Sequence, residues 1–80
     1  LEDGKAEVLE IVAPAQARLV GVPMRRLSIP RGALIAAILR EERVTVPHGE
    51  DHIQAGDTVV VLCIPEARAA VARMFRERVL

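Results

Sequence analysis

Short apolar runs separated by turn residues organise the chain. They cover residues 6–13, 33–39, 44–46 and 58–63, and they consist mainly of Val, Ile, Leu and Ala. Runs of this length and composition that stop at Pro, Gly or charged residues are typical of β-strands. We therefore predict four strands, and the unbroken run 33–39 predicts a strand that is buried on both faces.

Only residues 40–43 separate the second run from the third, which predicts a hairpin. A two-residue turn of the type that suits hairpins favours Asn or Gly at its centre. Here the central residues are Glu41 and Glu42, so we expect a looser turn.

Two further segments are predicted to be helical. Residues 15–20 fit a short helix that Gly21 closes. A longer helix begins at Pro65-Glu66, because Pro suits the first helical turn and an acidic side chain suits its positive end. Its apolar stripe consists of Ala67, Val71, Met74, Phe75 and Val79. The order strand, short helix, three strands, long helix predicts one α+β domain over 1–80 with a mostly antiparallel sheet.

Turn residues also dominate the segment between Pro47 and Asp57. A Pro-x-Gly turn is followed by one isolated apolar residue, Ile53, and then by Gly56-Asp57. We expect Ile53 to anchor the segment in the core. The Asp57 carboxylate is expected to accept hydrogen bonds from nearby backbone N–H groups, as Asp does in turns.

The charge balance narrows the classes of partner. Eleven basic and eleven acidic residues cancel, so nothing predicts a surface for nucleic acid or for an anionic membrane. The longest apolar runs are too short for a bilayer span. The lone Cys63 lies within an apolar run, which predicts a buried, inert thiol in a reducing compartment. The chain lacks an initiating Met, and we expect it to be part of a longer protein.

Apolar surface predicts self-association. Hydrophobic residues make up 51% of a short chain that contains one aromatic residue, so more apolar surface is expected than one helix covers. We expect a homodimer. The extended connector before the second strand and that strand itself are the predicted interface, through Leu27, Ile29, Leu34, Ile35 and Ile38.

Arginines predict where an effector binds, if one does. Ten of the eleven basic residues are Arg, and guanidinium groups form paired hydrogen bonds with phosphates and carboxylates. The predicted ligand-binding residues are Arg25, Arg26, Arg31 and Arg40. A solvated surface of ion pairs with neighbouring Glu residues is the simpler alternative.

Catalysis and metal binding are not expected. His48 and His52 have a spacing that chelates a metal on a helix, but Pro47 and Gly49 prevent a helix there. No third His or Cys completes a metal shell nearby. No nucleophile, base or paired carboxylates form a recognisable catalytic set, so we do not expect an enzyme.

An ordered set of short motifs covers most of the chain. It consists of Leu19-Val20-Gly21, Met24, the segment from Leu27 to Ile38 with Arg40, then Pro47-x-Gly49, Ile53 and Gly56-Asp57. This set resembles the TrkA-C domain, the C-terminal subdomain of RCK (regulator of K⁺ conductance) proteins.

The resemblance implies a cytoplasmic, dimeric regulatory domain that controls potassium or other cation transport. It implies two partners in a parent assembly, an RCK nucleotide-binding domain and a membrane channel or transporter. It also implies an effector such as cyclic di-AMP at the dimer interface, whereas NAD or ATP would bind outside this chain, which lacks Gly-x-Gly-x-x-Gly. The alternatives are a purely structural dimerisation module, the C-terminal domain of a cation/proton antiporter, and a swapped-strand transcription-factor domain. The balanced charge argues against the last of these.

Overall fold

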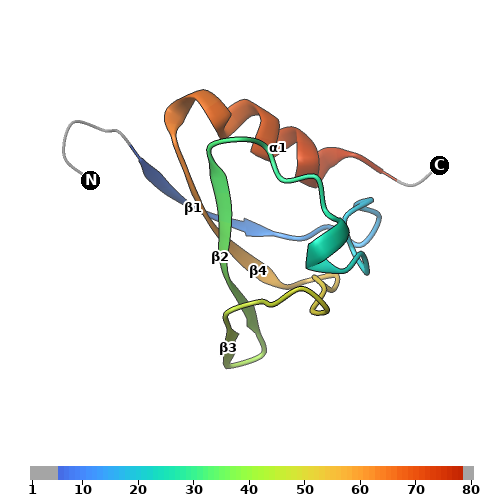
Figure 1. Ribbon diagram of the computed structural model, residues 1–80. Helices are drawn as coiled ribbons and strands as arrows, with labels where there is room; N and C mark the ends of the chain where they lie inside the picture. Colours follow the sequence, from blue (N-terminus) through green and yellow to red (C-terminus); the bar gives the residue numbers. More distant parts are fainter. Residues whose placement is uncertain (1–5, 79–80) are drawn as a thin grey trace.

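The computed structural model describes residues 6–78. It contains four strands, one α-helix and two short 3₁₀ helices (Figure 1). In chain order these are β1 (Glu7–Val12), η2 (Met24–Arg26), β2 (Ala33–Arg40), β3 (Arg43–Thr45), β4 (Thr58–Cys63), η3 (Pro65–Ala67) and α1 (Arg68–Arg76). The predicted α+β class is confirmed.

The four strands form one antiparallel sheet in the order β1-β4-β2-β3. The last strand in the sequence, β4, therefore lies between β1 and the β2–β3 hairpin, and it pairs with β1 on one side and β2 on the other. A bulge interrupts the β2–β4 register between Ile35 and Ala37. It adds one residue to β2, which lets Ile35 and Ile38 both point into the core although they are three residues apart.

The β2–β3 hairpin is tighter than the sequence predicts. Arg40 pairs with Arg43, so only Glu41 and Glu42 lie in the turn. Glu41 has a φ of 51°, a left-handed conformation that Gly or Asn adopts more easily. The expectation of a looser turn was wrong, because strand pairing on both sides holds Glu41 in this conformation.

The short helix predicted at 15–20 is not present. The segment forms successive turns instead, with hydrogen bonds from the N–H of Ala17 to the carbonyl of Pro14 and from that of Val20 to Ala17. A long-range hydrogen bond replaces a helical one, since the N–H of Arg18 donates to the carbonyl of Glu77 at 2.7 Å. The short helical element between β1 and β2 is instead η2, which begins directly after Pro23.

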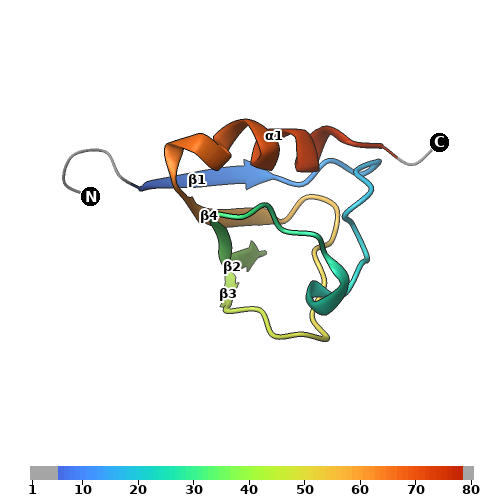
Figure 2. The same cartoon turned by 45° about the horizontal axis from the view of Figure 1, so that its top comes forward.

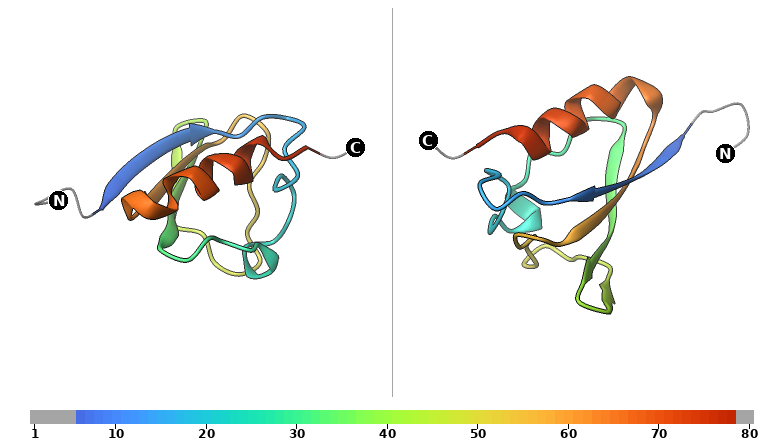
Figure 3. Two further views of the ribbon diagram at one scale, coloured as in Figure 1. Left: turned by 90° about the horizontal axis from the view of Figure 1, so that it is seen from above. Right: turned by 180° about the vertical axis from the view of Figure 1, so that it is seen from behind.

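Helix α1 covers one face of the sheet (Figures 2 and 3). The predicted apolar stripe is confirmed for Ala67 at the end of η3 and for Val71 and Phe75 of α1, which are buried, and Met74 packs against the core. Val79 lies outside the described residues. Opposite the helix, the inward side chains of the sheet complete an aliphatic core that consists of Ile35, Ile38, Val59, Val61 and Cys63.

The loop between β1 and β2 is hydrogen-bonded to the loop between β3 and β4 beside the sheet. Gly21 N–H donates to the carbonyl of Ile53 at 2.9 Å, and Met24 N–H donates to that of Asp51 at 2.8 Å. Ile53 is fully buried, which confirms its predicted role as the anchor of its loop. These backbone bonds fix η2 and the turn before β4 relative to the sheet.

Candidate functional site

The sheet face opposite α1 carries large exposed apolar side chains. We call it the outer sheet face and define it by Val8, Val12, Leu34, Leu39, Val44 and Leu62, each of which is at least 36% exposed. Val8, Leu34 and Val44 reach 65%, 57% and 68%. Soluble monomers rarely expose large apolar patches, and such patches mark interaction sites.

The strand register places these side chains in two rows. One row runs across Val8, Leu62 and Leu34, which pair through the central strand β4. The other runs across Val12, Thr58, Leu39 and Val44. Because side chains alternate along a strand, both rows lie on the same side of the sheet, away from the core.

A shallow hollow lies at the Leu34 end of the outer sheet face. It has a volume of about 250 Å³, and its lining includes Gly32, Leu34, Leu62 and Ile64. Gly32 has a φ of +89°, and a Cβ there would lie 2.7 Å from Cδ1 of Ile64. The turn before β2 therefore approaches the end of β4 as closely as a glycine allows.

The structure corrects part of the predicted interface. Ile35 and Ile38 are 7% and 2% exposed and belong to the domain's own core, so they present no surface to a partner. Leu27 and Ile29 are half-buried against that core. Leu34 alone of the five is exposed, and with Leu39 it shows that β2 is not buried on both faces. The alternation of inward and outward side chains along β1 could have added Val8 and Val12 to the predicted interface.

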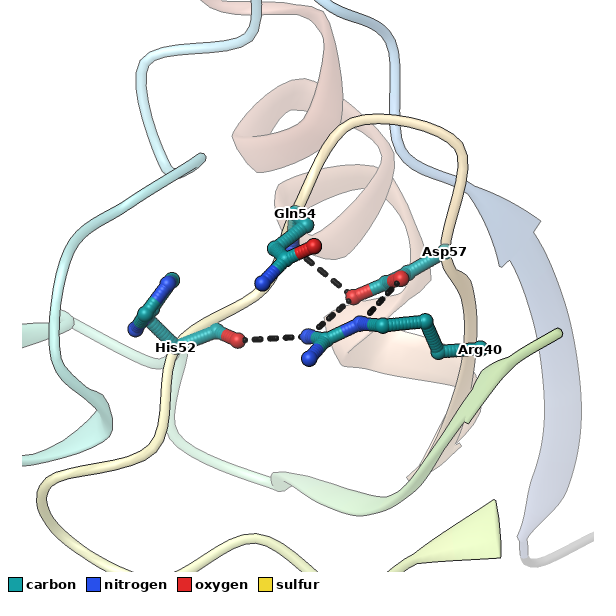
Figure 4. A network of polar contacts seen from close by, with 4 residues as sticks. All are labelled: Arg40, His52, Gln54 and Asp57. Carbon is teal, nitrogen blue, oxygen red and sulfur yellow. Dashed lines mark hydrogen bonds and ion pairs between the residues drawn. The ribbon is translucent and has the colours of Figure 1, made fainter. Parts of the chain in front are cut away.

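Arg40 has a structural partner. Its guanidinium donates from Nε and Nη2 to the two carboxylate oxygens of Asp57, at 2.9 and 2.8 Å, and from Nη2 to the carbonyl of His52 at 3.0 Å (Figure 4). Asp57 is 2% exposed and also accepts the backbone N–H of Gln54 at 2.8 Å, as predicted for this turn.

These bonds change the ionisation of both side chains. The hydrogen bond from Arg40 lowers the pKa of Asp57, although burial opposes the shift, and the same bond raises the pKa of Arg40. An ion pair with this geometry ties the end of β2 to the start of β4. Arg40 is therefore engaged within the domain.

The other three predicted effector-binding arginines do not converge on one cavity. Arg25 pairs with Glu50 at 2.7 Å, and both side chains are exposed. Arg26 lines a groove beside α1, and Arg31 lies in the turn before β2. Ion pairs among residues 6–78 join other side chains, which leaves Arg26 and Arg31 as the members of the predicted set without a carboxylate partner there.

The two histidines lie in the loop before β4, and both are exposed. Asp51 accepts the backbone N–H of His48 at 2.8 Å, an arrangement typical of a turn. Residues 6–78 contain no group of three or more His, Cys, Asp or Glu side chains arranged to hold a metal. Cys63 is buried, as predicted. Among the described residues, no helix has the length and apolar character needed to cross a membrane.

Comparisons with known proteins agree on one family. The TrkA-C domain model matches residues 8–76. The Trk system potassium uptake protein TrkA homolog 2 of Methanosarcina mazei is 32% identical over 76 residues, which are 95% of this chain and 17% of that protein. The Trk system potassium uptake protein TrkA of Mycobacterium tuberculosis is 34% identical over 71 residues, 89% of this chain and 32% of that protein.

A solved structure shares the fold. It is described as "Structure of RCK domain with cda" and superimposes with a TM-score of 0.72 at 19% identity, covering 85% of this chain and 96% of that one. The two potassium uptake proteins named above are much longer than this chain, which spans a third or less of their length. The match over residues 8–76, the antiparallel sheet with its C-terminal helix and the relatives together show that this chain belongs to the TrkA-C domain family.

Proposed function

We propose that this chain is the regulatory, dimerising domain of a cytoplasmic potassium-uptake protein. Membership of the TrkA-C family supports a role in potassium transport, since its relatives are named as Trk potassium uptake proteins. The observation that carries the dimerisation is the outer sheet face, because a single copy leaves it exposed. In this role the domain performs no catalysis and acts by changing the conformation of the proteins to which it is attached.

Dimerisation through the outer sheet face buries the row formed by Val8, Leu34 and Leu62. A second copy supplies the same apolar row, as the two-fold symmetry of most homodimers requires. An RCK nucleotide-binding domain and a membrane transporter are the proposed partners on the remaining surfaces. Association of the two copies then couples the parent subunits.

The dimer is tested by sedimentation of the chain with Leu34→Glu or Leu62→Glu. Each change places an unpaired carboxylate in the proposed interface, so the wild type should sediment as a dimer and both variants as folded monomers. Ala69→Glu is the matched control, because Ala69 is exposed on α1 rather than on the sheet. A dimer that persists in both sheet variants would contradict the assignment.

We further propose that a phosphate-bearing effector such as cyclic di-AMP binds where two copies meet, beside Arg31. Arg31 is exposed, precedes Gly32 at the hollow next to Leu34, and has no ion-pair partner among the described residues. The related RCK domain, whose structure is described as solved with cda, has the same fold. Binding that favours one of two conformations would shift the equilibrium of the attached transporter.

Thermal unfolding in the presence of cyclic di-AMP, ATP, ADP and NADH tests the effector. A ligand at 100 times its dissociation constant adds about 2.7 kcal/mol, which raises the melting temperature of a domain this size by about 10 °C. The shift should disappear in Arg31→Ala and persist in Arg43→Ala, which changes an exposed arginine of β3. No shift with any nucleotide, in a protein that still dimerises, would leave a purely structural dimerisation module.

A further inference from the structure

A groove lies between the C-terminal turns of α1 and the loop that carries η2. Its volume is about 220 Å³, and its apolar lining comes from Leu19, Val22, Leu27 and Met74. Leu19 is buried, and the other three are half-buried. No lining residue of the groove belongs to a strand, so the groove is separate from the outer sheet face.

Charged side chains of both signs line the same groove. They are Arg18 and Arg26 from the loop and Glu77 from the end of the helix. All three are exposed, and the ion pairs found among residues 6–78 involve other side chains. Arg18 N–H also donates to the carbonyl of Glu77 at 2.7 Å, a bond that holds the two sides of the groove together.

Size and charge together restrict the occupant. Sites for cofactors and drug-sized ligands typically have volumes of about 300–1,000 Å³, so this groove is too small for a dinucleotide. Its lining suits one aliphatic or thioether side chain. Arg18 and Arg26 are suited to a carboxylate, whereas Glu77 is suited to an ammonium group.

These requirements are met together by a small zwitterion with an apolar side chain. We propose that the groove binds a free apolar α-amino acid of the leucine or methionine type. The carboxylate pairs with the guanidinium groups, the ammonium group pairs with Glu77, and the side chain lies against Met74. The site is independent of the proposed dimer interface and of any nucleotide effector.

Titration with leucine, followed through the methionine methyl resonances of the 80-residue chain, tests the proposal. The two methionines serve as probe and internal control, because Met74 lines the groove and Met24 does not. Leucine should shift the Met74 methyl signal at millimolar concentration or below. Leucinamide lacks the carboxylate and N-acetyl-leucine lacks the ammonium group, so each should bind about tenfold more weakly.

Matched variants complete the experiment. Arg26→Ala and Glu77→Gln should each weaken leucine binding about tenfold, whereas Arg25→Ala, which changes the neighbouring arginine outside the groove, should leave it unchanged. The proposal is overturned if leucine leaves the Met74 signal in place, or if all three probes bind equally well. Equal binding would mean that the groove recognises only an apolar side chain.

Discussion

At the scale of single residues, Asp57 carries the most consequential polar contacts. It is buried, accepts two hydrogen bonds from Arg40 and one from the backbone, and so joins β2, β4 and the turn between Gln54 and Asp57. Removing one partner of such a group leaves the other without compensation, which is costly in a buried site. The exposed Arg25–Glu50 pair has no comparable role, since both of its side chains remain in water.

The Asp57 carboxylate should make folding sensitive to acid. Its pKa in the folded chain lies below the value of about 3.9 typical of an unfolded chain. The unfolded chain therefore takes up this proton first as the pH falls, so the contribution is complete above about pH 5 and is lost as the pH falls through the folded pKa.

We expect the free energy of unfolding of the wild type, measured with urea, to fall steeply below about pH 5. Asp57→Asn should be less stable at neutral pH and should show a shallower fall. The hydrogen bond from Arg68 also lowers the pKa of Glu7. Glu7→Gln therefore serves as the control that separates the contribution of this second carboxyl from that of Asp57. Identical slopes for the wild type and Asp57→Asn would contradict the assigned role.

Two features require glycine at position 32: its positive φ and the close approach of the Ile64 side chain. Their effects on stability can be separated. Gly32 and Gly56 have nearly the same φ, +89° and +87°, but a Cβ would meet Ile64 only at Gly32. Gly56→Ala should therefore lower the free energy of unfolding by about 1–2 kcal/mol through backbone strain alone, and Gly32→Ala should lower it further. Denaturant unfolding measures both losses. In an Ile64→Ala background the two glycine substitutions should cost the same, and a difference that persists would mean that Ile64 is not the cause.

At the scale of elements, the hairpin turn stores backbone strain at one position. Glu41 adopts a positive φ, which costs a non-glycine residue about 1–2 kcal/mol, whereas Glu42 does not. Glu41→Gly should therefore raise the free energy of unfolding by up to about 1 kcal/mol, after the greater entropy of an unfolded glycine is subtracted.

The neighbouring residue provides the control for this prediction. Glu42→Gly should destabilise the domain by about 0.5–1 kcal/mol, because it adds the entropy of glycine without relieving strain. Opposite signs in urea unfolding would locate the strain at Glu41. Destabilisation by both substitutions would contradict it.

The elements differ in how far local sequence determines them. The strand at 58–63 and the helix after Pro65 agree with their predictions, because apolar composition, Pro and the helical stripe all favour the same structure. The segment 15–20 has helix-compatible residues, but the N–H of Arg18 bonds to the carbonyl of Glu77, and the N–H of Gly21, directly after the segment, bonds to that of Ile53. Partners this distant in the sequence have no local signal.

At the scale of the whole molecule, the candidate site was only partly predictable. The sequence indicates surplus apolar surface, and this surface exists, but it spreads over all four strands rather than along one segment. An unbroken apolar run such as 33–39 does not reveal which side chains point outward, and the bulge in β2 shifts the alternation. Predicting the ion pair of Arg40 with Asp57 requires the register of β2 against β4, and the sequence alone does not reveal this register.

Dimerisation should be visible in the thermodynamics of the intact domain. If folding and association are coupled, the melting temperature of the wild type rises with protein concentration, because mass action favours the dimer. Calorimetry across a hundredfold range of concentration measures this rise. Leu34→Glu should melt at a temperature independent of concentration, and so would the wild type if the outer sheet face had no partner.

The central place of β4 affects how the domain is made. Strands β1 and β2 both pair with this strand, which is the last of the four to be synthesised. While the ribosome is still translating the loop before Thr58, β1 has no neighbour, and only the small β2–β3 hairpin has both of its strands. Pairings between distant parts of a chain slow folding, since the intervening loops must close first. The nascent chain can therefore complete its sheet only after Cys63 has left the exit tunnel.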